Sequence, residues 1–462
     1  MRCMRAGWAI LSLLLVLQLH SAWSQTVQTI LTNGPSSNRL NIVVLSEGYT
    51  SAQLTQFLVD ATNAVNTLLS HAPCQEYRNY CNAFAIKVAS NQSGSDHPVG
   101  PTYRDTYFNS SYDQFYDLLI TIPPNDFDTN YNHGQGKIDS LLQTNVPLCH
   151  LPILLVNDTV YGGSDGFDKT AIASVGFSSF DILTHETGHV LANLGDEYSL
   201  PYPGFPDTEE PNTTRQTNAA LIKWKSWIPT NTPLPTPPVA TNSSVIGLFE
   251  GAHYHSNGWY RPKLNCMMNT PGVSFCEVCS EALVLSIYQR VRPVDGFLPA
   301  TTNFSVATTQ ALSFSVALLQ PTTHNLGVQW QTNGVAVPGA TNMSFNILPV
   351  LLGNGTQTVS AVVKDNTTLV RNDPANLLSQ TVRWTLNVNI PQLHLDSPLW
   401  LAGGKFAFRI SGNAPLGVVV HSSTNALTWT PVATNSLFGG QFWYTNFTAG
   451  AQKKFFRAST PP

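Results

Sequence analysis

The sequence predicts a multidomain protein in which a layered α/β domain precedes two all-β modules. The chain has 462 residues, which is about three times the usual length of one domain. Across residues 25–295, short apolar runs alternate with stretches of helical spacing, the pattern of a sheet covered by helices. Beyond residue 300, short alternating runs are separated by turn signals without a helical pattern, which predicts β-structure for residues 300–390 and 391–462.

Residues 1–24 are predicted to be a signal peptide. Basic residues precede the apolar run 9–19, and the small residues that follow place the cleavage site near Ser24 and Gln25. A single membrane anchor is the alternative, but this run is shorter than the roughly 20 residues that a spanning helix needs. We therefore expect a secreted, extracellular protein without a membrane span.

The charge balance argues against a nucleic-acid-binding protein. The chain has 23 Lys and Arg against 27 Asp and Glu, a formal net charge of −4. It therefore has no excess of positive charge to attract a phosphate backbone. Charged residues make up only 11% of the chain and hydrophobic residues 42%, so we expect folded domains whose polar surface is built from amides and hydroxyls.

Local patterns predict the elements of the first domain in order. Residues 42–45 form an apolar run that predicts a buried strand. Thr50, with Gln53 three residues later, predicts a capping box at the start of a helix whose apolar spacing continues to Leu69. Further strands are predicted at residues 84–88, 118–122 and 151–156.

The later regions differ in character. Residues 202–238 are rich in Pro, Thr and Asn, which predicts a long irregular loop at the surface or near a functional site. The length of residues 300–390 and the central Trp330 are typical of an immunoglobulin-like β-sandwich, although this stretch contains no cysteine. Residues 391–462 are predicted to form the second small all-β module.

Six of the seven cysteines follow the predicted signal peptide, and an even number in an exported chain predicts disulfides. Cys74 and Cys81 are close in sequence, and three others lie between residues 266 and 279, so local bridges are expected. Cys276-x-x-Cys279 could instead be a redox pair or half of a structural zinc site. The second CxxC pair of a zinc ribbon is missing, which disfavours the zinc alternative.

The most informative motif is HExxH, formed by residues 185–189. Because a helix turns once every 3.6 residues, His185 and His189 lie on one face and can bind a single zinc ion. Glu186 is then beside the zinc-activated water, where it can act as the general base. Apolar residues around the motif support a helix, and two surface histidines on an ordinary helix are the alternative.

A zinc hydrolase usually has a third protein ligand. The longer pattern HExxHxxGxxH is broken here, because Ala192 and Gly195 occupy its glycine and its last histidine position. Gly195 is suited to a left-handed helix cap that would turn Asp196 back toward the ion. We expect Asp196 to be the third ligand, with Glu197 as the alternative.

Residues around 253–268 predict further parts of the same site. A buried methionine below the histidines would form a Met-turn, for which Met268 fits better than Met267. Tyr260 is a candidate donor to the oxyanion of the tetrahedral intermediate, and packing is its alternative role. The other candidates for this donor are Tyr254, His253 and His255.

A second type of ion is considered for residues 161–168. Asp165 and Asp168 resemble part of an oxygen-rich calcium loop, but the full twelve-residue pattern is absent. An ordinary turn is therefore favoured, and Ca²⁺ is left without support.

Separated motifs follow one another along about residues 25–295. They comprise residues 45–50, 161–163, 185–189 with 196–198, 247–252, 260–262, 266–268 and 275–279. Together they resemble the M64 peptidases, the family of the bacterial IgA-cleaving metallopeptidases. The resemblance implies a secreted zinc endopeptidase with a metzincin-like catalytic domain, often followed by β-sandwich modules. It does not imply that immunoglobulin is the substrate.

The function expected from these features is hydrolysis of peptide bonds in extracellular proteins by a zinc metallopeptidase. The alternative is a catalytically silent cell-surface or polysaccharide-binding protein with a peptidase-like domain. The intact set of His185, Glu186, His189 and a following acid favours the enzyme. The two carboxy-terminal modules are expected to be spacers, or to contact a cell surface or polysaccharide.

Overall fold

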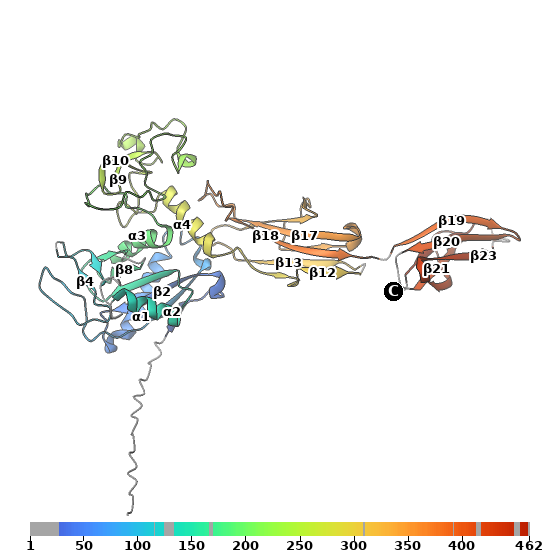
Figure 1. The fold of residues 1–462 in the computed structure, drawn as a ribbon, viewed down its shortest axis with the longest axis horizontal. Helices are drawn as coiled ribbons and strands as arrows, with labels where there is room; N and C mark the ends of the chain where they lie inside the picture. The colour runs from blue at the N-terminus through green and yellow to red at the C-terminus, as the bar shows by residue number, and fades with distance from the viewer. Residues whose placement is uncertain are drawn as a thin grey trace, which may run out of the picture.

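The computed structural model describes residues 27–460, except for 115, 124–133, 166–169, 308–309, 391, 413–416 and 448–452. The predicted signal peptide and its cleavage site lie outside the described residues. Figure 1 shows the described helices gathered in the first part of the chain, followed by two parts built from strands. In the described part of the chain, no helix combines the length and the apolar character that crossing a bilayer requires.

The first part is organised by a six-stranded sheet with the order β1-β3-β2-β6-β8-β7. Strands β3, β2, β6 and β8 are parallel, whereas the edge strands β1 and β7 are antiparallel to their neighbours. All eight residues of β2 are buried, as expected for a parallel strand covered on both faces. The strands are β1 (Val27–Leu31), β2 (Leu40–Glu47), β3 (Cys81–Ile86), β6 (Leu151–Val156), β7 (Gly163–Ser164) and β8 (Ala171–Ser174).

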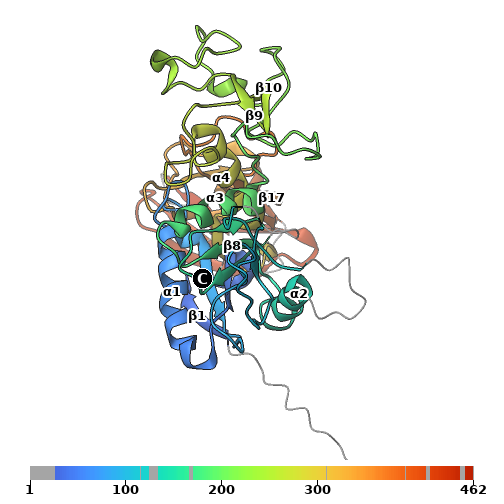
Figure 2. The same cartoon turned by 90° about the vertical axis from the view of Figure 1, so that its left-hand side faces the viewer.

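The described helices are α1 (Leu54–Leu68), α2 (Gly134–Asn145), α3 (Ser179–Ala192) and α4 (Glu277–Arg290). Successive residues of β2 face opposite sides of the sheet. Ile42 packs in a core with residues of α1, α3 and α4, whereas Val43 packs in a core with residues of α2. Figure 2 shows α1 and α2 on opposite sides of the sheet.

Two local predictions for the first part have different outcomes. The capping box of Thr50 and Gln53 is present, and it closes a short 3-10 turn that leads into α1. Within the apolar run 118–122, Ile120 and Thr121 form the short strand β5 (Ile120–Thr121), which pairs with β4 (Ser111–Tyr112), and Leu119 makes an isolated bridge to Gly163 of β7. Ile120 and Ile122 are buried, whereas Leu118 and Leu119 are exposed, so this run lacks the burial on both faces that a central parallel strand requires.

A long segment without regular helices separates α3 from α4. Its strands are β9 (Phe249–Ala252) and β10 (His255–Arg261), which form a separate two-stranded sheet. The predicted loop 202–238 contains neither a strand nor an α-helix and has one short 3-10 turn, Lys225–Trp227. This segment contains Asp196, Tyr254, Met267 and Met268, which belong to the candidate site.

Two sheets of the second part pack around one core. The sheets have the orders β11-β13-β16 and β12-β18-β17-β14-β15. Trp330 is fully buried and stacks on Trp384, with ring centroids 5.8 Å apart and an angle of 20° between the rings. Trp330 therefore shares the centre of this sandwich with a second tryptophan. The strands are β11 (Val294–Leu298), β12 (Asn303–Val306), β13 (Leu312–Leu318), β14 (Gly327–Thr332), β15 (Val335–Ala336), β16 (Ser344–Ile347), β17 (Gly355–Lys364) and β18 (Ser379–Val388).

The sandwich is joined to the first part by buried hydrogen bonds. Asp365, directly after β17, accepts hydrogen bonds from the hydroxyls of Tyr77 at 2.8 Å and Tyr288 at 2.6 Å. The hydroxyl of Tyr80 donates to the carbonyl of Leu319 at 2.7 Å. Because all three tyrosines belong to the first part, these contacts fix the sandwich against α4.

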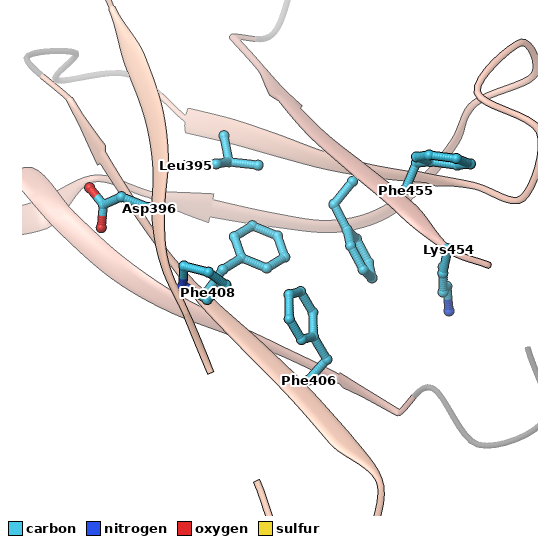
Figure 3. A pocket seen from close by; sticks show the side chains of 8 residues that line it. Leu395, Asp396, Phe406, Phe408, Lys454 and Phe455 are labelled. Carbon is cyan, nitrogen blue, oxygen red and sulfur yellow. The ribbon is translucent and has the colours of Figure 1, made fainter. Parts of the chain in front are cut away.

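The third part consists of two three-stranded sheets with the orders β19-β20-β23 and β22-β21-β24. Its small core includes Ile410 and Val418. Figure 3 shows an apolar hollow in this part, with Phe406 and Phe408 on its wall and Lys454 at its edge. The strands are β19 (Leu393–Leu401), β20 (Lys405–Gly412), β21 (Gly417–Ser423), β22 (Thr430–Ser436), β23 (Gln441–Phe447) and β24 (Phe455–Ser459).

Candidate metal centre

Helix α3 carries the HExxH motif and presents both histidines on one face. The Nε2 atoms of His185 and His189 lie 3.1 Å apart. His185 is 5% exposed, and the helix packs through Leu183 and Val190 into the core between the sheet and α4. The four-residue spacing therefore brings two imidazole nitrogens to one point in a buried environment.

The chain turns directly after α3 and brings Asp196 to the same point. The Oδ1 atom of Asp196 lies 3.1 Å from Nε2 of His185 and 3.4 Å from Nε2 of His189. The residue with a left-handed backbone is Asn193, at φ 53°, and not Gly195 as predicted. Asparagine tolerates this conformation, so the helix can end at Ala192 with Asn193 as its C-cap. A Cβ on Gly195 would lie 2.5 Å from the Glu210 carboxylate, so a larger residue there would displace that side chain.

The hydrogen bonds of the two rings fix their tautomers. Nδ1 of His185 lies 2.9 Å from the carbonyl oxygen of Met267, and Nδ1 of His189 lies 2.6 Å from that of Leu194. A carbonyl oxygen can only accept, so each Nδ1 carries a proton. In the neutral rings both Nε2 atoms then present lone pairs to each other and to the Asp196 carboxylate.

The distances between these three atoms match those between the ligand atoms of one zinc ion. Bonds of about 2.0–2.2 Å to nitrogen and oxygen place the ligand atoms of a tetrahedral zinc about 3.3 Å apart. The three separations here are 3.1, 3.1 and 3.4 Å. His185, His189 and Asp196, which we call the histidine cluster, could therefore hold a metal ion and leave a fourth position open.

The ionisable groups in and beside the histidine cluster shift one another's pKa values. Burial raises the pKa of Glu186 to about 7, although the two histidines oppose this effect. Burial alone would lower the pKa of His189, but the charge of Asp196 outweighs it and raises this pKa to about 10. The pKa of Asp196 is lowered by the two imidazoles against the effect of burial. The cluster therefore attracts positive charge to its centre.

Glu186 lies beside the histidine cluster and is not one of its three convergent groups. Its Oε2 atom is 4.0 Å from Nε2 of His189, and the residue is 8% exposed. It follows His185 directly on α3, so its carboxylate reaches the edge of the cluster. This position suits a base that acts on a group held at the open position.

Both predicted methionines lie behind the histidines. Met267 and Met268 are fully buried, and the carbonyl of Met267 holds Nδ1 of His185. The sulfur of Met268 would lie 2.8 Å from a Cβ on Gly188 of α3. Met268 thus packs directly against the motif helix, and Met267 contributes its backbone.

Tyr260, the first candidate for the oxyanion donor, is not the tyrosine whose hydroxyl contacts Asp196. Tyr260 lies on β10, and its backbone pairs with Thr214. The hydroxyl of Tyr254 donates to Oδ2 of Asp196, so of these two tyrosines it is Tyr254 that contacts the histidine cluster. Sequence reasoning could not rank the two, because this contact spans 58 residues and an irregular segment.

The side chains of His253 and His255 make their hydrogen bonds outside the histidine cluster, although the backbone N–H of His253 donates to the carbonyl of Asp196 at 2.9 Å. His253 stacks on Trp259 at 3.8 Å and bonds Glu210 at 3.1 Å. The Nδ1 atom of His255 faces the carbonyl of His253. Asp165 is exposed directly after β7, and Asp168 lies outside the described residues, so the structure adds no support for calcium.

Glu197, the alternative third ligand, points elsewhere. Its Oε1 atom accepts a hydrogen bond from Nδ2 of Asn212 at 2.9 Å and lies 3.2 Å from Sγ of Cys279. The structure thus places Asp196, and not Glu197, beside the two histidines.

The six described cysteines are free, so the predicted disulfides are not seen in this structure.

A family comparison covers the residues of this site. The sequence profile described as IgA peptidase M64 matches residues 28–242 and 238–287. The matched region runs from β1 into α4, covers more than half of the chain, and contains the histidine cluster with Glu186. The chain belongs to the IgA peptidase M64 family. The resemblance noted from the separated motifs is confirmed.

The M64 chain has no match among curated proteins. Solved structures that resemble parts of it have TM-scores too low to indicate a shared fold. They include apo β-glucuronidase 3 of Bacteroides uniformis, with 10% identity and a TM-score of 0.15 over 44% of this chain and 27% of that chain. This chain thus spans about a quarter of that enzyme's length.

Two other solved structures have similarly weak likeness. One comes from the chaperone and tip adhesin complex of CFA/I fimbriae biogenesis, with 9% identity and a TM-score of 0.15 over 36% of this chain and 92% of that chain. The other is the amphioxus IgVJ-C2 molecule, with 12% identity and a TM-score of 0.14 over 34% of this chain and 98% of that chain.

The M64 match ends inside α4, before β11. The sandwich and the last β-part therefore lie outside the region that defines the family. Membership of a peptidase family implies a protein substrate, and it assigns this role to the first part of the chain alone.

Proposed function

We propose that this M64 chain is a secreted zinc endopeptidase with a metzincin-like catalytic domain. His185, His189 and Asp196 would hold the ion. When bound, zinc supplies Lewis-acid chemistry that polarises the scissile carbonyl and acidifies a water ligand. Secretion is supported by the signal-peptide pattern in residues 1–24.

One observation carries the metal proposal. Both Nδ1 atoms donate to carbonyl oxygens, which leaves two imidazole lone pairs and a carboxylate oxygen within 3.4 Å of one another. Lone pairs at such distances repel unless a positive charge lies among them. A divalent cation satisfies all three groups at once, and two additional protons would be the alternative.

Glu186 is proposed to move the proton of the reaction. Its carboxylate accepts a proton from the water that attacks the carbonyl and passes it to the leaving amine. Its burial and its position 4.0 Å from His189 Nε2 support this role. A carboxylate can both take and return a proton, which an amide in its place could not do.

Tyr254 is proposed to orient the third ligand. Its hydroxyl bonds Oδ2 of Asp196, and Oδ1 of the same carboxylate then faces the histidines. Hydrogen bonds to the outer atom of a metal ligand commonly fix its direction. The oxyanion role expected for Tyr260 stays a prediction.

The proposal is tested on the purified mature chain with unfolded casein as substrate. We expect hydrolysis that stops after treatment with a chelator and returns when zinc is added. The double variant H185A/H189A should bind one zinc fewer and lack activity. Hydrolysis that continues after complete removal of metal would refute a zinc-dependent mechanism.

A further inference from the structure

A second group of metal-binding side chains lies behind the histidine cluster. Glu197, Cys266, Cys276 and Cys279, which we call the cysteine cluster, place their ligand atoms within 4.8 Å of one another. The Sγ atoms of Cys266 and Cys279 are 3.6 Å apart, and Sγ of Cys279 is 3.2 Å from Oε1 of Glu197. All four residues are buried.

We propose that the cysteine cluster is a structural metal site that holds one zinc ion through three thiolates and one carboxylate. Bonds of about 2.3 Å to sulfur place two sulfur ligands of a tetrahedral zinc about 3.8 Å apart. The observed 3.6 Å fits this geometry. Four protein ligands would close the coordination sphere, which is typical of structural and not of catalytic zinc.

Glu197 supplies an independent indication of a ligand. The residue is fully buried, and its Oε2 atom has no hydrogen-bond partner among the described residues. A buried carboxylate oxygen without a partner is costly and rare in folded proteins. A metal ion held by this carboxylate would remove that cost, and Asn212 already orients the other oxygen at 2.9 Å.

The local backbone suits thiolate ligands. Cys276 is the N-cap of α4, and Cys279 lies in its first turn, where the positive end of the helix stabilises negative charge. The backbone N–H of Cys276 donates to Sγ of Cys266 at 3.3 Å. The CxxC pair alone predicts only half a zinc site. Glu197 lies 69 residues before the nearest of these cysteines, so no local spacing connects it with them.

A disulfide is the main rival in an exported protein. Any bridge within the cysteine cluster would use two thiols and leave the third beside the buried Glu197 carboxylate. That arrangement would not satisfy Oε2 of Glu197. Metal ligation uses all four side chains, so it accounts for more of the geometry.

The site would also hold parts of the histidine cluster in place. Glu197 directly follows Asp196, and its backbone N–H donates to the carbonyl of Met268 at 2.8 Å. Cys266 directly precedes Met267, whose carbonyl orients His185. This positioning role rests on the proposed function, whereas the existence of a second metal does not.

Metal counting on the full mature chain, purified without chelator or reductant, tests the second site. We expect two zinc ions per chain, and one in H185A/H189A. After exchange with cobalt(II), that double variant should keep the intense thiolate-to-metal absorption. C276S/C279S should lose this absorption. C149S, a control for thiol removal, should keep both the absorption and two zinc ions per chain.

Alkylation of the native wild-type chain keeps the test independent of whether the cysteine variants fold. Cys266, Cys276 and Cys279 should become reactive only after metal removal, without a reductant. One zinc in the wild type and none in H185A/H189A would overturn the second site. A disulfide among the three cysteines would also overturn it. Two bound zinc ions without casein hydrolysis would instead reject the proposed function and leave the second site standing.

Discussion

Asp196 and Glu197 are adjacent in sequence, yet their carboxylates belong to different clusters. Oδ1 of Asp196 lies 3.1 Å from Nε2 of His185, whereas Oε1 of Glu197 lies 3.2 Å from Sγ of Cys279. The backbone between them is held from two sides. The carbonyl of Asp196 accepts from the N–H of His253, and the N–H of Glu197 donates to the carbonyl of Met268. The two acids are therefore not interchangeable.

The first prediction separates these acids by metal content. D196N should weaken zinc binding at the histidine cluster more than tenfold and abolish casein hydrolysis, because it removes the anionic ligand. E197Q should lower metal affinity at the cysteine cluster and leave the two histidines able to bind zinc. Metal analysis of both variants, with the cobalt absorption as readout, checks this assignment. If E197Q loses the ion of the histidine cluster and D196N keeps it, the assignment is reversed.

The second prediction concerns Glu186. E186Q should retain the zinc content of the wild type, because Glu186 is not one of the three convergent groups. It should reduce kcat for casein or a peptide by about 10²–10⁴, the usual contribution of a general base. E250Q, which changes an exposed glutamate on β9, is the matched control and should stay within about twofold of the wild type. Wild-type activity in E186Q would exclude this residue as the base.

Contacts between residues close in sequence could be predicted at this site, whereas contacts between distant residues could not. The HExxH residues lie within five positions, so helical periodicity alone places both imidazoles together. Asp196 could be predicted as the third ligand because it follows the helix end closely. The left-handed residue, however, is Asn193 and not Gly195. Tyr254 is one of several candidates that sequence cannot rank, since an irregular segment that has no periodic signal brings it back to Asp196.

The same reasoning applies to the fold. Residues 42–45 and 151–156 could be identified as strands because burial on both faces produces continuous apolar runs. Run 118–122 has the same composition but lies largely outside the main sheet, and local sequence carries no information on that placement. The buried contacts of Asp365 with Tyr77 and Tyr288 join segments more than 70 residues apart, so no local pattern predicts them.

The third prediction tests the packing of Met268 below the motif helix. Alanine at position 188 would gain about 1 kcal/mol of helix propensity over glycine. Its Cβ would lie 2.8 Å from the sulfur of Met268 and 3.2 Å from Leu194, and such overpacking typically costs 1–3 kcal/mol, in rough terms. G188A should therefore lower Tm and weaken zinc binding. G100A adds a Cβ with no atom within 4 Å, so its Tm should stay close to that of the wild type.

The last prediction concerns the ion pair that joins the first part to the sandwich. Arg39 is 2% exposed and donates to both carboxylate oxygens of Asp295 on β11, at 2.7 and 2.6 Å. Burial tends to raise the pKa of Asp295, but hydrogen bonds from Arg39 and Asn38 outweigh it and lower this pKa.

A carboxyl whose pKa is lower in the folded state stabilises the fold above its unfolded pKa of about 3.9. This contribution is lost as the pH falls through the folded pKa. The free energy of unfolding should therefore decrease below about pH 4, and D295N should be less stable than the wild type at neutral pH, because Arg39 loses its charged partner. The stability of D295N should also depend less on pH in the acid range. Urea unfolding of both proteins at neutral and acidic pH measures this difference, and parallel pH curves would show that the pair does not contribute.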